Sequence, residues 1–234
     1  GYTDEYLLDI DLLLSKVDKK TAIVFLPNPN IPISGTLNLK ALRMIASHCL
    51  KTNTFLVIDE VYYPFGGPTA TSLIDDFDNL FVIQSFSKAF GLASIRLGYL
   101  LGNTSNIDYV SKTRTGYESN SISIAIASFF IDNYYLVENY IHQVKDGFEY
   151  LKHEFDKNNL VYDGGTDGNF IYLYLGSEDL SNKIVTKLRD KKIYIRIGWG
   201  AYSNGVLITG APRHLLINFF TEFIKIYNDL KKDI

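Results

Sequence analysis

Four apolar runs of strand length divide the first half of the chain, and each ends at polar or glycine residues. They lie at 21–26, 54–58, 81–84 and 97–101. The first two are apolar almost throughout, which is typical of strands that are buried on both faces of a sheet. Between them, residues 38–51 place apolar side chains at helical spacing, and this pattern predicts a helix with one face in the core. Strands separated by helix-length connections predict an α/β architecture with a mostly parallel sheet.

The pattern changes after about residue 120, where longer amphipathic segments predominate. The helices and strands predicted there are helices at 121–133, 135–157, 177–191 and 213–232 and strands at 169–175, 193–197 and 206–209. We therefore expect a three-layer large domain over residues 1–133 and a small α+β domain over residues 134–234.

Polar residues follow three of the predicted strands at the point where each strand ends. In parallel α/β sheets, ligands bind at the carboxyl ends of the strands, because loops and helix N-termini meet there. A carboxylate, a phenol and an amine at one such edge have chemical meaning, since the acid would pair with a cationic ring nitrogen and the amine would form an imine. The candidate residues at these exits are Asn30, Asp59, Tyr62, Ser85, Ser87 and Lys88.

Charge and composition remove several classes of function. The formal net charge is −3 and no basic block is present, so nucleic acid is not an expected partner. The one cysteine, Cys49, cannot form an intramolecular disulfide, and the four histidines share no ligand spacing, so we expect no metal site. The sequence shows neither a long apolar span nor an export signal, and we expect a cytoplasmic protein without a membrane segment.

Three motifs carry a resemblance to a known family. Residues 85–99 (Ser-Phe-Ser-Lys-Ala-Phe-Gly-Leu-Ala-Ser-Ile-Arg-Leu-Gly-Tyr) resemble the lysine signature of the fold type I pyridoxal-phosphate aminotransferases. Residues 59–62 (Asp-Glu-Val-Tyr) are similar to the family's Asp-Glu-Ala-Tyr, and residues 117–121 (Tyr-Glu-Ser-Asn-Ser) resemble the stretch that follows in those enzymes. Within the family, the chain looks most like the histidinol-phosphate aminotransferase group and its decarboxylase relatives.

The resemblance implies a pyridoxal 5′-phosphate cofactor and assigns roles at its ring. Lys88 would bind the cofactor as a Schiff base and then act as the general base that moves a proton between substrate and cofactor. Asp59 would pair with the ring nitrogen and keep it protonated, so that the ring can accept electrons. Tyr62 would hydrogen-bond to the cofactor's phenolic oxygen.

The phosphate contacts follow the family pattern, whereas the neighbouring loop departs from it. The resemblance assigns the phosphate to Ser85, Ser87 and Arg96, whose guanidinium offers two parallel donors. In the loop at 28–35, an isoleucine stands where the family has the asparagine that touches the phenolic oxygen. We expect Asn30 to take over that contact.

The implied reaction transfers an amino group between an amino acid or a phosphorylated amino compound and a 2-oxo acid, in a homodimer. Residues 206–209 (Val-Leu-Ile-Thr) lack the arginine that the family uses here to hold the substrate's anionic group. Arg196 and Arg213 are therefore the candidates to replace it. Trp199, which stands between two glycines in a predicted loop near the family's substrate side, is a further candidate for a substrate contact.

Two alternatives remain open at this point. One is a pyridoxal-phosphate-dependent decarboxylase of a phosphorylated amino acid, because the same sheet edge serves both reactions. The other is a truncated, non-catalytic subunit that keeps the fold, since the resemblance begins about a third of the way into such enzymes. We accordingly expect the chain to be the latter part of a longer protein.

Overall fold

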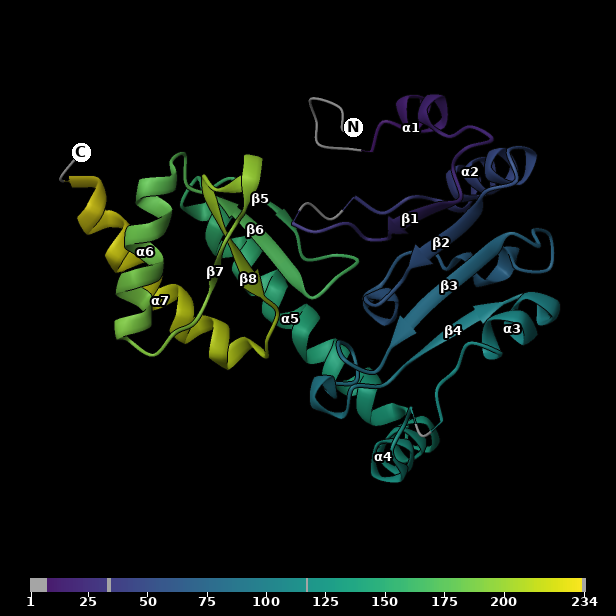
Figure 1. The fold of residues 1–234 in the computed structure, drawn as a ribbon. Coiled ribbons are helices and arrows are strands. Elements are labelled where there is room, and N and C mark those ends of the chain that lie inside the picture. The colour runs from purple at the N-terminus through teal and green to yellow at the C-terminus, as the bar shows by residue number, and fades with distance from the viewer. Residues whose placement is uncertain (1–7, 33–34, 117, 233–234) are drawn as a thin grey trace. The chain divides into compact units, whose positions relative to one another are not determined.

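A computed structural model describes residues 8–32, 35–116 and 118–232 of the chain. The chain divides into two compact units: residues 1–31 with 35–137, and residues 32–34 with 138–234. Each unit is built around one four-stranded sheet (Figure 1). Tyr117, the first residue of the third motif, lies outside the described residues.

The sheet of the first unit has the order β1-β2-β3-β4. β1 pairs with β2 and β2 pairs with β3 in parallel, whereas β4 runs antiparallel to β3. This arrangement confirms the predicted α/β class with a mostly parallel sheet. The helices and strands of this unit are α1 (Ile10–Lys16), β1 (Ile23–Pro27), α2 (Leu39–Lys51), β2 (Phe55–Asp59), β3 (Leu80–Ser85), β4 (Gly98–Gly102), α3 (Thr104–Ser111) and α4 (Ser121–Asp132).

One face of this sheet packs against α2. The helix begins where the Asn38 side chain accepts a hydrogen bond from the backbone N–H of Ala41, at 2.9 Å. Of the predicted apolar stripe, Leu39 at the first position is exposed, and the others are buried. The main residues of this core are Val24, Leu26, Leu42, Ile45, Ala46, Cys49, Leu56, Ile58, Leu80 and Val82.

The opposite face of the sheet corrects the prediction that 21–26 and 54–58 are buried on both sides. Ile23, Phe25 and Phe55 have exposed fractions of 59%, 56% and 44%. Successive residues of a strand face opposite sides of the sheet, so only alternate residues reach the α2 side. On the other side, α3 borders a groove of about 340 Å³ whose lining includes Ile23, Phe55 and Tyr109. The described elements of this unit thus leave the β1 and β2 side chains on this face partly exposed to solvent.

Leu56 and Phe55 offer a matched test of this asymmetry, because they are neighbours on opposite faces. Leu56 is fully buried, so Leu56→Ala should lower the free energy of unfolding by about 2–5 kcal/mol. Phe55→Ala should cost only about 1 kcal/mol, because much of that ring already contacts water. Urea denaturation of both variants checks the prediction, and equal losses would contradict it.

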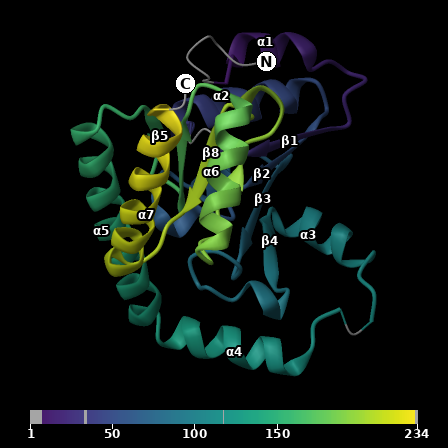
Figure 2. The ribbon, with the colours of Figure 1, turned by 90° about the vertical axis from the view of Figure 1, so that its left-hand side faces the viewer.

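The sheet of the second unit is antiparallel throughout, in the order β5-β6-β8-β7. α6 and α7 lie side by side in both views (Figures 1 and 2). The helices and strands here are α5 (Tyr135–Lys157), which begins in the first unit, β5 (Tyr162–Gly164), β6 (Phe170–Tyr174), α6 (Glu178–Asp190), β7 (Arg196–Ile197), β8 (Gly205–Thr209) and α7 (Arg213–Lys232).

The strand predicted at 193–197 is shorter in the structure, where β7 covers only Arg196–Ile197. The reason is the end of α6. Lys192 has a left-handed backbone, with φ of 61°, and the backbone N–H of Ile193 donates to Leu188 O at 3.0 Å. The backbone N–H of Ile193 is therefore used in closing the helix, and the strand begins only at Arg196.

Candidate functional site

The three predicted strand exits lie at one edge of the first sheet. Pro27 is paired with Asp59, and Asp59 with Ile83, so β1, β2 and β3 end side by side. The backbone N–H of Asn28 donates to Asp59 O at 2.9 Å, which continues this register beyond β1. Parallel pairing thus brings the loops that follow residues 27, 59 and 85 to a common edge, where α/β sheets bind their ligands.

Asp59, Tyr62 and Lys88 come together at this edge. The Lys88 ammonium nitrogen lies 5.2 Å from the centre of the Tyr62 ring, which is itself buried. Burial raises the pKa of the Asp59 carboxyl, while a hydrogen bond from the Val61 N–H and the positive charge of Lys88 lower it by less. A partly desolvated acid and an amine therefore share one site, with an aromatic ring beside the amine.

The predicted phosphate ligands are only partly assembled. Ser85 Oγ accepts a hydrogen bond from the Ser87 N–H at 3.1 Å and donates to Leu97 O at 3.4 Å, so both serines lie in one turn. Arg96 has a left-handed backbone with φ of 54°, and its guanidinium donates to Ala93 O at 2.8 Å. The guanidinium is exposed and bonded to its own turn, so the structure does not show it joined to the serines.

The loop after β1 holds a buried amide that sequence reasoning passed over. Asn30, the predicted ligand, is partly buried, whereas Asn28 is only 2% exposed. Asn28 Oδ1 accepts a hydrogen bond from the Leu37 N–H at 2.8 Å, and its Nδ2 has no hydrogen-bond partner among the residues that the structure describes. An asparagine at a strand end was a visible signal, but its burial depended on the return of the chain at Leu37.

The substrate candidates of the second unit lie on exposed positions. The Arg196 guanidinium lies 4.9 Å from the centre of the Trp199 ring, which places these two side chains together. Arg213 begins α7, lies 3.4 Å from a carboxylate oxygen of Asp146, and also covers the Tyr150 ring at 5.4 Å. Both arginines can present a positive charge to solvent.

Metal binding, a reactive cysteine and a membrane-spanning helix find no support in the described ranges. They contain no group of three histidine, cysteine or acidic side chains that could hold a metal ion. Cys49 is fully buried in the core, and burial raises the pKa of its thiol to about 11, so it is a packing residue. None of the helices in these ranges combines the length and the apolar character that crossing a bilayer requires.

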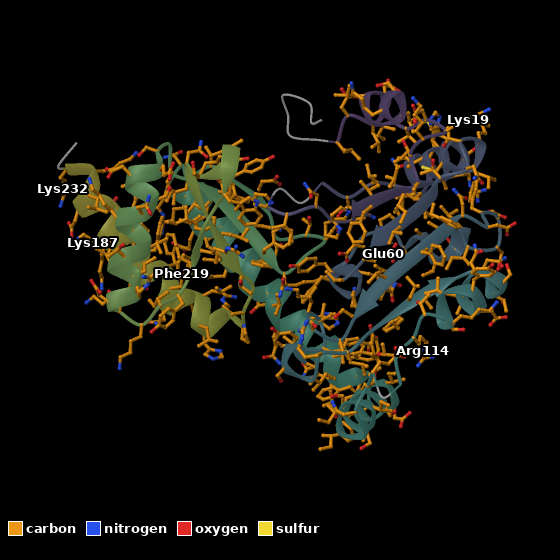
Figure 3. The ribbon with its side chains drawn as sticks, in the orientation of Figure 1. Lys19, Glu60, Arg114, Lys187, Phe219 and Lys232 are labelled. Carbon is orange, nitrogen blue, oxygen red and sulfur yellow. The ribbon has the colours of Figure 1, made fainter. Side chains whose placement is uncertain are left out.

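Glu60 is a further residue that sequence reasoning did not single out. It follows Asp59 directly and is only 1% exposed, and Figure 3 labels it near β2 in the first unit. Gln84, which precedes Ser85, is also buried and donates to the Glu60 carboxylate at 3.0 Å. Along β2 and β3 every second residue lies in the core, and Glu60 and Gln84 fall at the next core-facing positions. A polar residue at such a position was the signal that could have revealed this pair.

Comparison with known proteins gives a consistent result. The sequence model of the family described as aminotransferase class I and II matches residues 2–205. The histidinol-phosphate aminotransferase of Thermotoga neapolitana is 29% identical over 191 residues, which cover 82% of this chain and 54% of that enzyme. The enzyme of the same name from Methanothermobacter thermautotrophicus is 36% identical over 149 residues, covering 63% of this chain and 39% of that one. This chain spans about half the length of the first of these relatives.

Solved structures share the fold. A histidinol-phosphate aminotransferase from Sinorhizobium meliloti, in complex with pyridoxal-5′-phosphate, has a TM-score of 0.87 at 24% identity and covers 98% of this chain and 64% of that one. A decarboxylase from Sulfurospirillum multivorans has a TM-score of 0.78 at 23% identity and covers 96% and 67%. The match of the family model over most of the sequence, together with this fold, shows that the chain belongs to the class I and II aminotransferase family.

Proposed function

We propose that the chain forms the lysine-bearing part of a pyridoxal-phosphate-dependent aminotransferase of the histidinol-phosphate type. The observation that carries the proposal is the meeting of Lys88, Asp59 and Tyr62 at the carboxyl edge of a parallel sheet. The reaction would transfer an amino group between an amino acid or a phosphorylated amino compound and a 2-oxo acid. The name of the similar enzymes makes histidinol phosphate the first compound to test.

The donor set at this edge fits pyridoxal phosphate. When bound, the cofactor supplies an aldehyde for attachment and a ring that accepts electrons while its nitrogen is protonated. The chain offers an amine at Lys88, a half-buried carboxylate at Asp59 and paired serines at Ser85 and Ser87. The Nδ2 of Asn28, which bonds to none of the described residues, adds a buried donor in the loop after β1.

Each side chain at the cofactor ring has a distinct task in this proposal. The Lys88 amine would be the group that holds the cofactor, and once free it would act as the general base that takes the proton from the substrate's α carbon. The Asp59 carboxylate would keep the ring nitrogen protonated. Its partly desolvated position would strengthen the attraction between the two charges. Tyr62 supports the amine through its ring and donates a hydrogen bond to the phenolic oxygen.

The remaining contacts serve binding and assembly. Ser85, Ser87 and Arg96 would hold the phosphate, which requires Arg96 to exchange its bond to Ala93 O for the anion. Asn30 is retained as a contact for the phenolic oxygen. Arg196, Arg213 and Trp199 are proposed substrate contacts in the second unit, where the arginines are exposed. We further propose a homodimer, as the resemblance implies.

Product analysis tests the proposal directly. The full-length protein is mixed with pyridoxal phosphate, nitrogen-labelled histidinol phosphate and a 2-oxo acid. We expect the label to appear in the amino acid formed from the 2-oxo acid. Release of carbon dioxide from an amino acid without nitrogen transfer would indicate a decarboxylase, and binding of cofactor without turnover of any amino donor would indicate a non-catalytic subunit.

A further inference from the structure

A buried carboxylate lies directly behind the proposed cofactor site. Glu60 Oε1 accepts a hydrogen bond from the Ala70 N–H at 2.6 Å. Its Oε2 accepts from Thr69 Oγ1 at 2.6 Å and from Gln84 Nε2 at 3.0 Å. An ionised carboxylate has only acceptors, and here each oxygen meets at least one donor, so the buried charge is well satisfied. Glu60 therefore ties the end of β2 to β3 and to the start of the 3₁₀ helix Ala70–Leu73.

Gln84 extends this hydrogen-bond network to β4. Its Oε1 accepts a hydrogen bond from the Tyr99 hydroxyl at 2.8 Å, and Tyr99 is its cross-strand partner in β4. Burial is the main cause that raises the pKa of the Tyr99 hydroxyl above its ordinary value, and the nearby Glu60 carboxylate acts in the same direction. The hydroxyl consequently remains a donor at neutral pH, so the order of donors and acceptors from Tyr99 to Glu60 is fixed.

The network and the proposed ligands occupy alternate positions of the same strands. Glu60 follows Asp59, and Gln84 precedes Ser85, so each of these two network residues has a proposed ligand as its chain neighbour on the other face. The Glu60 backbone N–H also donates to Ile83 O at 2.8 Å. Fixing the two inner side chains thus fixes the direction in which the outer ones leave the sheet.

We infer that Glu60 is a positioning residue for the cofactor site: with Gln84, it holds the exits of β2 and β3 in the register that lets Asp59 and the 85–88 turn face one ligand. The inference rests on the proposed function. It depends on the hydrogen bond between the Glu60 carboxylate, which can only accept, and the Gln84 amide nitrogen, which donates. Any change that places two donors or two acceptors face to face must separate the strand ends.

Exchanging the two side chains gives a sharp test. In Glu60→Gln, the new amide nitrogen faces a donor whichever way the amide is turned: the Gln84 amide nitrogen in one orientation and the Ala70 backbone N–H in the other. Turning the Gln84 amide over instead would deprive the Tyr99 hydroxyl of its acceptor. In Gln84→Glu, two carboxylates face each other. In the double exchange, one carboxylate again meets one amide and Tyr99 keeps an acceptor. In the full-length protein we expect each single variant to raise the Kd for pyridoxal phosphate about tenfold, and the double variant to return it to within about twofold of the wild type.

A control at the other end of the sheet separates positioning from stability. Asn79 is buried just before β3, and its Nδ2 donates to Thr54 O at 2.9 Å. Asn79→Ala should lower Tm through loss of a buried hydrogen bond and leave the Kd unchanged. A milder variant, Tyr99→Phe, removes only the outer, partly exposed member and should raise the Kd about threefold without unfolding the protein.

The possible outcomes are distinct. Rescue in the double variant together with an unchanged Kd in Asn79→Ala supports the inference. Wild-type affinity in both single variants, absence of rescue, or a Kd that follows Tm in Asn79→Ala as well would overturn it. A wild-type protein that binds no pyridoxal phosphate would instead contradict the proposed function.

Discussion

Lys88→Ala is expected to lower kcat/KM for amino-group transfer by about 10⁴-fold or more in the full-length protein. The variant loses both the amine that would attach the cofactor and the base that would move the substrate proton. Steady-state kinetics with saturating pyridoxal phosphate measure the change.

Lys112 supplies the matched control for this variant. Its ammonium nitrogen lies 4.3 Å from the Tyr109 ring, so it too is a lysine over a tyrosine, but it follows α3 and is exposed. Lys112→Ala should leave kcat/KM within about twofold of the wild type, because a single surface substitution seldom matters. Comparable losses in the two variants would show that the Lys88 effect is not specific to its site.

Asp59→Asn is expected to have opposite effects on catalysis and on stability. An asparagine cannot hold the proton on the cofactor's ring nitrogen by charge, so kcat/KM should fall at least about a hundredfold. Without cofactor, however, the variant should have a higher Tm than the wild type at neutral pH. Burial raises the pKa of Asp59, which means that ionising this carboxyl costs folding free energy.

The sign of the pH dependence follows from the raised pKa. Below the ordinary value of 3.8 the carboxyl is neutral in both the folded and the unfolded state, so the Tm difference should vanish there. It should grow as the pH rises through the higher native pKa. Asp163, in the second unit, also has a pKa raised by burial, and Asp163→Asn should therefore stabilise in the same direction without affecting cofactor binding. A lower Tm for Asp59→Asn at neutral pH would contradict this account.

The strand ends could be predicted from sequence because they depend on local contrast. Asp59 and Lys88 follow apolar runs that pair in parallel, and parallel pairing alone brings such residues to one edge. The helical spacing at 38–51 likewise predicted the buried face of α2, with Leu39 at its first turn the exception. The strand ends and the helical face can be recognised from neighbouring residues, and the common edge then follows from parallel pairing.

Features that depend on distant partners could not be predicted in the same way. Ile23 and Phe25 looked buried on both faces because their apolar character does not reveal what covers them. Glu60 meets Gln84 from 24 positions away, and Asn28 meets Leu37 across a loop, so their burial follows from the fold. At Ile193 the chain closes α6 after the left-handed Lys192 instead of continuing a strand.

Borohydride reduction with peptide mapping tests the central claim most directly. Full-length protein is mixed with pyridoxal phosphate and reduced so that any imine becomes a stable amine. The protein is then digested, and its peptides are identified by mass spectrometry. The account predicts a phosphopyridoxyl group on Lys88 alone, and a lower yield in Asp59→Asn than in Asp163→Asn. Labelling of another lysine, or of none, would contradict it.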